Sequence, residues 1–271
     1  MPAASMTARD AVGAAVDALE AAGCETPRLD AELLIAAALG VDRGLLVSDP
    51  GREVPPSAAR EIGERIRRRV MREPVAYILG RRGFRRIELA VDRRVLIPRP
   101  ETELLVEVAL ELPEGASVHE VGTGSGAVAL ALANERPGLR VTASDVSADA
   151  VAVAAANAER LGLSLAPFVA DGLPEQVAAV DLVVANLPYV TDAEWGGLAP
   201  EITRYEPRGA LTSGPDGLDA IRALVGQAPS GTRLALEHGS EQGAAVRELL
   251  VDAETRRDLA GHERVTVGVV R

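Results

Sequence analysis

From about residue 101 to residue 271, the chain alternates short aliphatic segments with segments of helical period, and this alternation constrains the fold more than any other feature. The expected strands are Ser117–Val121, Arg140–Ser144, Leu165–Val169, Val180–Ala185, Arg233–Glu237 and Arg264–Val270. The expected helices are Glu101–Leu112, Gly126–Glu135, Ala148–Leu161, Gly217–Val225 and Glu241–Leu250. Such alternation predicts an α/β fold with a mostly parallel sheet that helices cover on both faces.

The residues before this region have a different pattern, which predicts a separate helical bundle. A helix is expected from Thr7 to Ala22, a second opens at Thr26 and ends at Gly40, and a third starts at Ser57. The third helix carries apolar residues at every fourth position, as a buried face requires. Residues 81–100 mix apolar residues with arginines and predict a β-hairpin. We therefore expect a helical domain at 1–80, a hairpin linker at 81–100 and a sheet domain at 101–271.

Composition and charge exclude several classes of protein. The net charge of −11 argues against stable binding of nucleic acid, which needs clustered cations. Thirteen arginines and five acidic residues nevertheless lie between Arg60 and Arg99, so this segment is either a solvated helix face or a docking surface for an acidic or RNA-associated partner. One cysteine and three scattered histidines predict neither a disulfide nor a metal site. No apolar run is long enough for a membrane span, and we expect a cytoplasmic protein.

The stretch HEVGTGSGAVALALA places alternating glycines between an expected strand and an expected helix. Glycines allow a tight turn and a close approach of the backbone to a ligand, and the following helix presents free N–H groups. The candidate ligand-binding residues of this loop are Gly122, Thr123, Gly124, Ser125 and Gly126. The same spacing also fits a dinucleotide-binding turn or a purely structural turn.

Acidic residues around this loop favour S-adenosylmethionine over a dinucleotide. Glu120 would repel a pyrophosphate, but it suits a ligand with a cationic amine and a sulfonium. Asp145 ends the next strand, where it can accept hydrogen bonds from both hydroxyls of a ribose, although this position fits either cofactor. Asp171, followed by Gly172, lies at the same edge of the sheet and is a candidate acceptor for an adenine amino group, or a simple turn former.

The motif Asn-Leu-Pro-Tyr ends the strand that is expected at Val180–Ala185. The side-chain oxygen of Asn186 and the carbonyl of Leu187 can accept the two N–H bonds of a planar nitrogen and orient it for methyl transfer. Pro188 restricts Leu187 to extended conformations, and Tyr189 can stack on a flat acceptor. Such a nitrogen needs no strong general base, because after methylation it loses its proton readily. The motif therefore predicts methylation of an amino or amide nitrogen.

Taken together, these motifs resemble the peptide chain release factor N5-glutamine methyltransferases, the PrmC/HemK family. The resemblance covers nearly the whole chain and includes, in order, REPVAYILG, LIPRPETE, EVGTGSGAVALALA, SDVSADAVAVAAANAERLG, NLPY, YEPRGAL, LEHG and ERVTVG. It implies a Rossmann-like methyltransferase sheet that binds S-adenosylmethionine through the glycine loop and Asp145. It also implies that Asn186 to Tyr189 hold the glutamine of the Gly-Gly-Gln motif of class I release factors, and that the N-terminal bundle docks the release factor.

One departure from the family pattern keeps an alternative open. The family has Asn-Pro-Pro-Tyr, whereas this chain has Leu187 at the second position, a spelling found in ribosomal RNA adenine dimethylases. The alternative function is therefore N6-adenine methylation of ribosomal RNA. The N-terminal position of the helical domain and the acidity of the chain argue against it. We expect Asn186 to contact the cofactor as well as the substrate, and the protein to be a monomer. Arg99 and Glu101 are expected either to shape the mouth of the pocket or to have a purely structural role.

Overall fold

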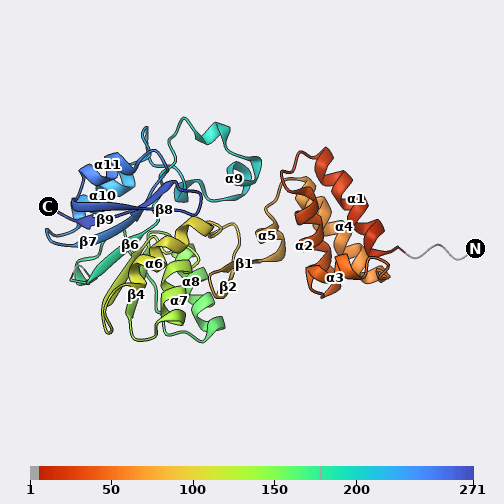
Figure 1. Ribbon diagram of the computed structural model, residues 1–271, viewed down its shortest axis with the longest axis horizontal. Coiled ribbons are helices and arrows are strands. Elements are labelled where there is room, and N and C mark those ends of the chain that lie inside the picture. Colours follow the sequence, from red (N-terminus) through yellow and green to blue (C-terminus); the bar gives the residue numbers. More distant parts are fainter. Residues whose placement is uncertain (1–5, 178) are drawn as a thin grey trace, which may run out of the picture. The chain divides into compact units, whose positions relative to one another are not determined.

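The computed structural model describes residues 6–177 and 179–271, and the chain divides into two compact units. The first unit consists of the residues up to 80 together with residues 199–205, and the second consists of residues 81–198 and 206–271. Figure 1 shows the chain coloured by sequence. The grouping of residues 199–205 with the N-terminal residues was not predicted from the sequence.

The first unit is a bundle of helices, as the sequence predicts. Its helices are α1 (Ala8–Ala21), α2 (Pro27–Leu39), α3 (Arg43–Ser48), α4 (Pro56–Val70), α5 (Val75–Leu79) and α9 (Pro200–Tyr205). Thr7 caps α1 with a capping box, in which its hydroxyl accepts from the N–H of Asp10 while the Asp10 carboxylate accepts from the N–H of Thr7. Alanine and leucine side chains of α1 and α2 pack with Ile62 of α4 to form the core.

Arginines of α4 and the turn after it are largely occupied by ion pairs inside this unit. The buried Arg69 guanidinium donates to Asp30 at 2.7 Å and lies 2.8 Å from Glu201 of α9. Arg72 donates to both carboxylate oxygens of Glu201, each at 2.7 Å. Further pairs join Arg65 to Glu61, Arg67 to Glu64 and Arg68 to Glu73. Glu201 therefore ties α9 to the helical unit.

The second unit starts with the predicted hairpin, which consists of β1 (Arg81–Phe84) and β2 (Ile87–Ala90) in antiparallel register. The side chain of Asn157 holds β2 in place, because its Oδ1 accepts from the N–H of Ala90 and its Nδ2 donates to the carbonyl of the same residue. The same amide group also donates to the carbonyl of Ser125 in the glycine loop. Asn157 therefore connects the hairpin to the loop.

A sheet of seven strands forms the centre of the second unit, in the order β5-β4-β3-β6-β7-β9-β8. The strands are β3 (Ser117–Val121), β4 (Arg140–Asp145), β5 (Phe168–Val169), β6 (Leu182–Ala185), β7 (Arg233–Glu237), β8 (Val251–Arg257) and β9 (Glu263–Val269). The strands from β5 to β7 pair in parallel, while β9 is antiparallel to both of its neighbours. This arrangement confirms the predicted α/β class. The chain order reverses between β3 and β6, and ligands bind at such a point in open α/β sheets.

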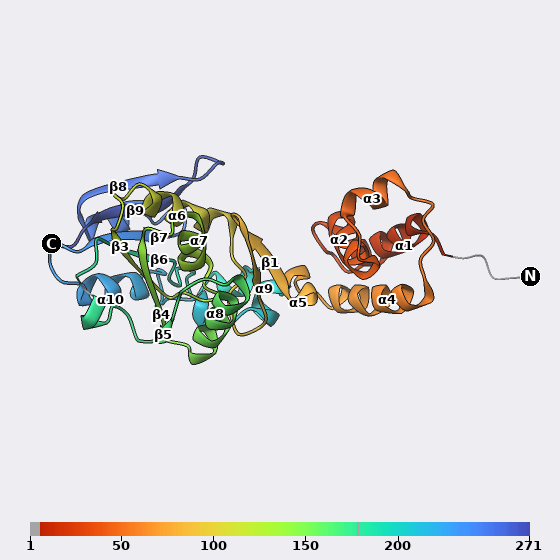
Figure 2. The same ribbon diagram turned by 90° about the horizontal axis from the view of Figure 1, so that it is seen from below.

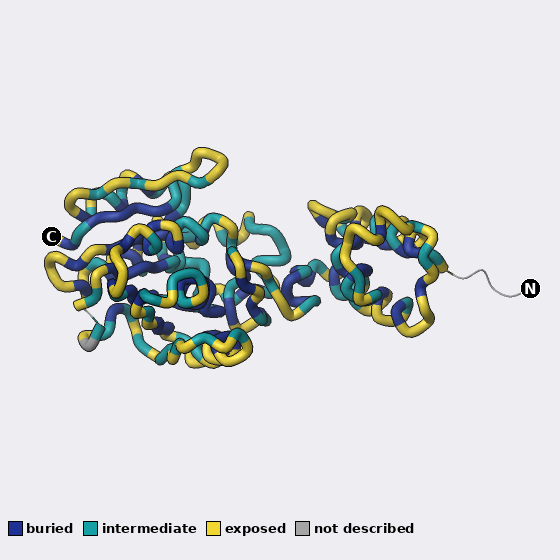
Figure 3. Tube along the Cα trace, turned by 60° about the horizontal axis from the view of Figure 1, so that its bottom comes forward, coloured by how far each residue is buried: buried dark blue, intermediate teal, exposed yellow. Residues whose placement is uncertain are grey.

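Helices cover both faces of this sheet (Figures 1 and 2). The helices are α6 (Glu103–Leu110), α7 (Ala127–Glu135), α8 (Ala148–Leu161), α10 (Asp219–Gln227) and α11 (Gly243–Glu248). Ile221 and Leu224 of α10 and Val246 of α11 pack on alternate residues of β6 and β7. Strands β6 and β7 are buried almost throughout (Figure 3), which explains their continuous aliphatic sequences.

Two expectations about strands were wrong. The strand expected at Leu165–Val169 is reduced to Phe168–Val169, because only these residues pair with β4. Strand β8 was not expected at all, since five of its seven residues are charged or polar and most of them are exposed. Charged side chains are typical of an edge strand, where they discourage pairing with other chains.

Candidate active site

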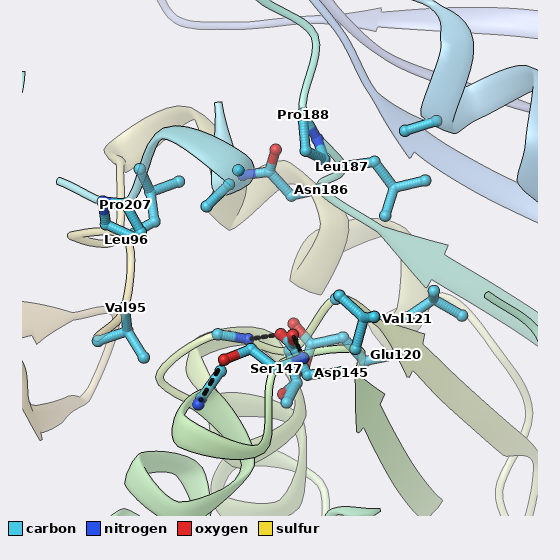
Figure 4. Close-up of a pocket in the computed structure, with 18 of the residues that line it drawn as sticks. Val95, Leu96, Glu120, Val121, Asp145, Ser147, Asn186, Leu187, Pro188 and Pro207 are labelled. Atoms are coloured by element: carbon cyan, nitrogen blue, oxygen red, sulfur yellow. Dashed lines mark hydrogen bonds between the residues drawn. The ribbon is translucent and has the colours of Figure 1, made fainter. Parts of the chain in front are cut away.

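A cavity of about 600 Å³ opens at the carboxyl ends of β3, β4 and β6. Its lining includes the glycine loop after β3, the end of β4, the Asn-Leu-Pro segment after β6 and the segments around Leu96 and Pro207. Figure 4 shows Glu120, Asp145 and Ser147 on one side of the cavity and Asn186, Leu187 and Pro188 on the opposite side. The predicted loop and the predicted acceptor motif therefore face the same space.

The glycine loop adopts a backbone that other residues rarely adopt. Gly122, Gly124 and Gly126 have φ angles of 73°, 55° and 85°, in the left-handed region. The N–H groups of Gly122 and Thr123 both donate to the carbonyl of Ser144, which anchors the loop to β4. A Cβ atom at Gly126 would lie 2.7 Å from Cδ1 of Leu130. A side chain at this position would therefore clash with Leu130 and would also strain the left-handed backbone.

Asp145 lines the cavity at the end of β4 and is nearly buried. Its Oδ2 accepts from the N–H of Gly124, and its Oδ1 accepts from the N–H of Ser147, both at 2.9 Å. This carboxylate therefore fixes the glycine loop and the start of α8 as well as facing the cavity. Each oxygen keeps a further lone pair with which it can accept from a hydroxyl.

Glu120 is buried at the end of β3 and also lines the cavity. Its Oε2 accepts from the Thr123 hydroxyl at 2.6 Å and from the N–H of Ala129 at 3.0 Å, which leaves Oε1 for another donor. Burial raises the pKa of Glu120 to about 8, and the nearby Asp145 charge adds to this rise. A buried carboxyl of this kind is stabilised as an anion when a cation is placed beside it.

Asp171 and Gly172 lie on the cavity wall after β5, as the sequence predicts. Asp171 is exposed, and Gly172 has a φ of 73° with the side chain of Gln227 packed against it. Gln227 accepts from the N–H of Leu173 at 3.0 Å and so fixes the turn. Gln227 was not predicted from the sequence, because a glutamine near the end of a helix has no distinctive pattern.

The side chain of Asn186 is held in one orientation at the end of β6. Its Nδ2 donates to the Thr102 hydroxyl at 2.9 Å, so Oδ1 is the atom that remains for a ligand. Leu187 packs its side chain against the glycine loop, since a Cβ at Gly122 would lie 3.2 Å from Leu187 Cδ2. Leu187, which stands where the family pattern has proline, therefore fills the space beside Gly122.

A smaller cavity of about 30 Å³ lies beside the Asn-Leu-Pro-Tyr segment. It is lined by Leu96, Arg99, Asn186, Leu187, Tyr189, Val190, Ala210 and Leu211. Burial raises the pKa of Tyr189 to about 12, so its phenol is neutral at physiological pH.

The segment after residue 205 closes one wall of the site and is fixed by Glu206. This buried carboxylate accepts from Arg99 at 2.5 Å and from the N–H of Ile97 at 3.1 Å. Pro207, Gly209 and Ala210 follow and line the large cavity. Arg99 therefore lies at the site as expected, whereas Glu101 lines neither cavity. The segment that forms this wall was recognisable in the sequence as the YEPRGAL motif, but the motif alone did not indicate that the segment lines the site.

Among residues 6–177 and 179–271, no cluster of His, Cys, Asp and Glu is suited to hold a metal ion. Within the same part of the chain, none of the helices combines the length and the apolar character that crossing a bilayer requires.

Comparisons with known proteins agree with the geometry. Two family models match: one described as PrmC N-terminal domain over residues 10–80, and one described as methyltransferase small domain over residues 100–203. A release factor glutamine methyltransferase of Xylella fastidiosa is 43% identical over 268 residues, covering 92% of this chain and 96% of that protein. A protein of the same name from Pseudomonas aeruginosa is 46% identical over 257 residues, covering 89% of this chain and 92% of that protein. Among solved structures, the chain is similar to the catalytic domain of hMettl16, which was solved in complex with MAT2A 3'UTR hairpin 6. The sequence identity is 13% and the TM-score is 0.51, and the match covers 68% of this chain and 75% of that chain. This similarity shows a shared fold only.

Proposed function

Since the chain belongs to the release factor glutamine methyltransferase family, we infer that it transfers a methyl group to the side-chain amide nitrogen of a glutamine, the one in the Gly-Gly-Gln motif of translation release factors. The observation that carries this inference is the cavity in which a glycine loop faces the Asn186 amide. The methyl donor of this enzyme is S-adenosylmethionine.

The residues of the large cavity fit this cofactor. A cavity of about 600 Å³ is of the size that ligands of this class need. Asp145 would accept from the ribose hydroxyls, Asp171 and Gly172 would border the adenine, and Oε1 of Glu120 would face the cationic amine. Gly122, Thr123, Gly124 and Ser125 of the loop line the cavity and would lie against the ligand, because the absence of a side chain at Gly122 and Gly124 lets the backbone approach closely, whereas Gly126 does not line the cavity and would shape the turn. When bound, the cofactor supplies an electrophilic methyl group on a sulfonium.

Asn186 and Leu187 would orient the acceptor. Oδ1 of Asn186 and the carbonyl of Leu187 would accept the two N–H bonds of the glutamine amide, so that the nitrogen lone pair points toward the methyl group. Held in this way, the amide nitrogen would receive the methyl group that the sulfonium supplies, and the methylated amide would lose its extra proton to water. Tyr189, neutral and half-buried, would cover one face of the amide.

We propose that the helical unit recognises the body of the release factor. The ion pairs of α4 favour the interpretation of the arginine-rich segment as a self-neutralised surface over a basic docking site for an acidic partner. Recognition would then depend on the shape of the unit and on exposed apolar side chains such as Leu29, Leu45 and Val47. We also propose that the enzyme is cytoplasmic, acts as a monomer, and forms no stable complex with nucleic acid.

The test uses the full-length protein with S-adenosylmethionine and two acceptors. One acceptor is a class I release factor, and the other is the same factor with its Gly-Gly-Gln glutamine changed to alanine. We expect mass spectrometry to find one added methyl group on the first acceptor and none on the second. Methylation of ribosomal RNA in place of the release factor would establish the alternative, which the comparisons support less.

A further inference from the structure

The wall of the site after β6 carries an aromatic–cation contact that has no role so far. Trp195 is the only tryptophan of the chain, and it lies half-buried in the short 3-10 helix η3 (Trp195–Gly197). The guanidinium carbon of Arg208 lies 5.2 Å from the centre of the indole ring, the arrangement of a cation–π contact. Arg208 begins a second short helix, η4 (Arg208–Ala210), so the contact joins two turns of the chain. We call these two side chains the rim pair.

The rim pair stands beside the acceptor end of the cavity. Ala210, the last residue of η4, lines both the large cavity and the small one, as does Asn186. Because a 3-10 helix rises about 2 Å per residue, Arg208 lies about 4 Å from Ala210 along the helix axis. Pro207, which precedes Arg208, lies on the same side as Asn186 in Figure 4, across the cavity from Asp145. The rim pair is therefore near the acceptor motif rather than near the cofactor loop.

Main-chain and side-chain hydrogen bonds hold the two turns in place. The N–H of Val190 donates to the carbonyl of Leu211 at 2.8 Å, which ties the segment before η3 to the segment after η4. The carboxylate of Glu194 accepts from both the N–H and the hydroxyl of Thr191, at 2.9 and 2.8 Å, and fixes the turn before Trp195. A surface that is ordered in advance loses little conformational entropy on binding a partner.

The rim pair keeps its hydrogen-bond donors available. The Arg208 side chain is 59% exposed, and the oxygen of its acidic neighbour Asp192 lies 3.7 Å away, beyond hydrogen-bond distance. Within the described part of the chain, neither the guanidinium nor the indole N–H of Trp195 donates a hydrogen bond to another residue. By contrast, Arg99 on the same wall donates to Glu206. Since guanidinium and indole can donate but not accept, the rim pair offers donors and an aromatic face.

This chemistry matches the main chain of a protein segment. The residues next to a glutamine held in the cavity advance by at most about 3.6 Å each, so they leave the cavity past its edge with their carbonyls available as acceptors. Tryptophan and arginine are also enriched among the residues that dominate binding between proteins. RNA bases stack on aromatic rings too, but the acidic Asp192 and Glu194 beside the rim pair oppose a phosphate backbone.

We propose that the rim pair binds the two glycines that precede the target glutamine in the protein substrate. The indole of Trp195 packs against the main chain of these glycines, and the guanidinium of Arg208 donates to their carbonyls. Glycine suits this contact because it has no side chain to hold the main chain away from the ring. The proposal rests on the function inferred above and adds to it a determinant of which glutamine is accepted.

The first part of the test compares kinetics of full-length variants on a class I release factor. Trp195→Ala and Arg208→Met should each raise KM for the factor by about tenfold, while kcat and the calorimetric Kd for S-adenosylmethionine stay unchanged. Arg208→Lys keeps the charge but loses the planar fork, so it should raise KM by a smaller factor. The matched control is Arg256→Met on β8, which removes another exposed, ion-paired arginine and should leave KM unchanged. An unchanged KM in both Trp195→Ala and Arg208→Met, or a weakened affinity for the cofactor in either, would overturn the proposal.

The second part observes Trp195 without any methyl transfer. Because the chain has a single tryptophan, enzyme labelled with 5-fluorotryptophan gives one fluorine NMR signal, and an unlabelled release factor adds none. We expect this signal to shift when the release factor is added, to shift less with a factor whose two motif glycines are changed to alanine, and to stay in place with a fragment of ribosomal RNA. A signal that ignores the release factor, that responds equally to the alanine factor, or that shifts with the RNA would refute the proposal. A shift with the release factor together with no methylation of it would refute only the inferred function.

Discussion

Binding of S-adenosylmethionine should release a proton from Glu120. The pKa of this buried carboxyl is raised to about 8, so the free enzyme carries the proton at pH 7. Its Oε1 is not used by Thr123 or Ala129, and we expect the cationic amine of the ligand to lie beside it. An adjacent cation lowers the pKa of a carboxyl, so the proton leaves when the ligand binds.

The size of the effect follows from the pKa of the free enzyme. At pH 7, one unit below this pKa, deprotonation costs about 1.4 kcal/mol, so affinity should be about tenfold lower than it would be for an enzyme in which this carboxyl is already ionised. The sign follows from linkage: a group that loses a proton on binding makes affinity increase with pH, up to the pKa of the free enzyme. About 0.9 protons should be released per ligand at pH 7.

Isothermal titration calorimetry in buffers of different ionisation enthalpy measures this release directly. The titrations should stay below about pH 7.5, where the amine of the ligand keeps its own proton. Glu120→Gln preserves an acceptor for Thr123 and Ala129 and should bind without releasing a proton. 5′-Methylthioadenosine, which has neither the amine nor the sulfonium, should release none from the wild-type enzyme. Binding enthalpies that are the same in every buffer for the wild-type enzyme would refute this reasoning.

Three further substitutions test other parts of the structure. Asn186→Ala should lower kcat by about a hundredfold or more while calorimetry finds the cofactor affinity unchanged, and turnover near the wild-type rate would exclude its acceptor-orienting role. Gly126→Ala should destabilise the protein by about 1–3 kcal/mol in urea unfolding and weaken cofactor binding, because the new Cβ contacts Leu130 and the backbone at this position is left-handed. The control is Gly63→Ala in α4, where the new methyl group has free space, and this change should not destabilise the protein. Arg69→Met should destabilise the helical unit by about 3–5 kcal/mol because it leaves the buried Asp30 without its cation, while Glu201 keeps its pair with Arg72. Arg67→Met, at an exposed pair, should leave the unfolding midpoint unchanged.

The sequence predicted those parts of the fold whose local pattern is strong. The helix at Ala148–Leu161 was predicted with the observed bounds, and the predicted cap at Thr7 is present, because both depend on nearby residues. The glycine loop and the Asn-Leu-Pro-Tyr segment were placed correctly at one edge of the sheet, since parallel strands bring their carboxyl ends together. Whether each predicted residue binds its ligand stays a prediction.

Features that depend on distant partners could not be predicted. Strand β8 is recognisable only from its pairing with β9, because its own residues are polar. Glu237 was part of the LEHG motif, but only the structure shows that its buried carboxylate has no hydrogen-bond partner among the described residues. Glu120 was expected to serve the ligand, but that it also accepts hydrogen bonds from Thr123 and Ala129 is seen only in the structure.

The grouping of α9 with the helical unit has a practical consequence for protein engineering. Tyr205 donates to the carbonyl of Met71 at 2.7 Å, and Glu201 joins Arg69 and Arg72, so the unit is completed by a piece of chain encoded far downstream. A truncation at residue 80 would therefore remove most of the bundle but leave α9 behind, with Glu201 and Tyr205 stripped of their partners. Grafting the helical unit onto another enzyme would need two exchanged segments, so the two units are not interchangeable modules.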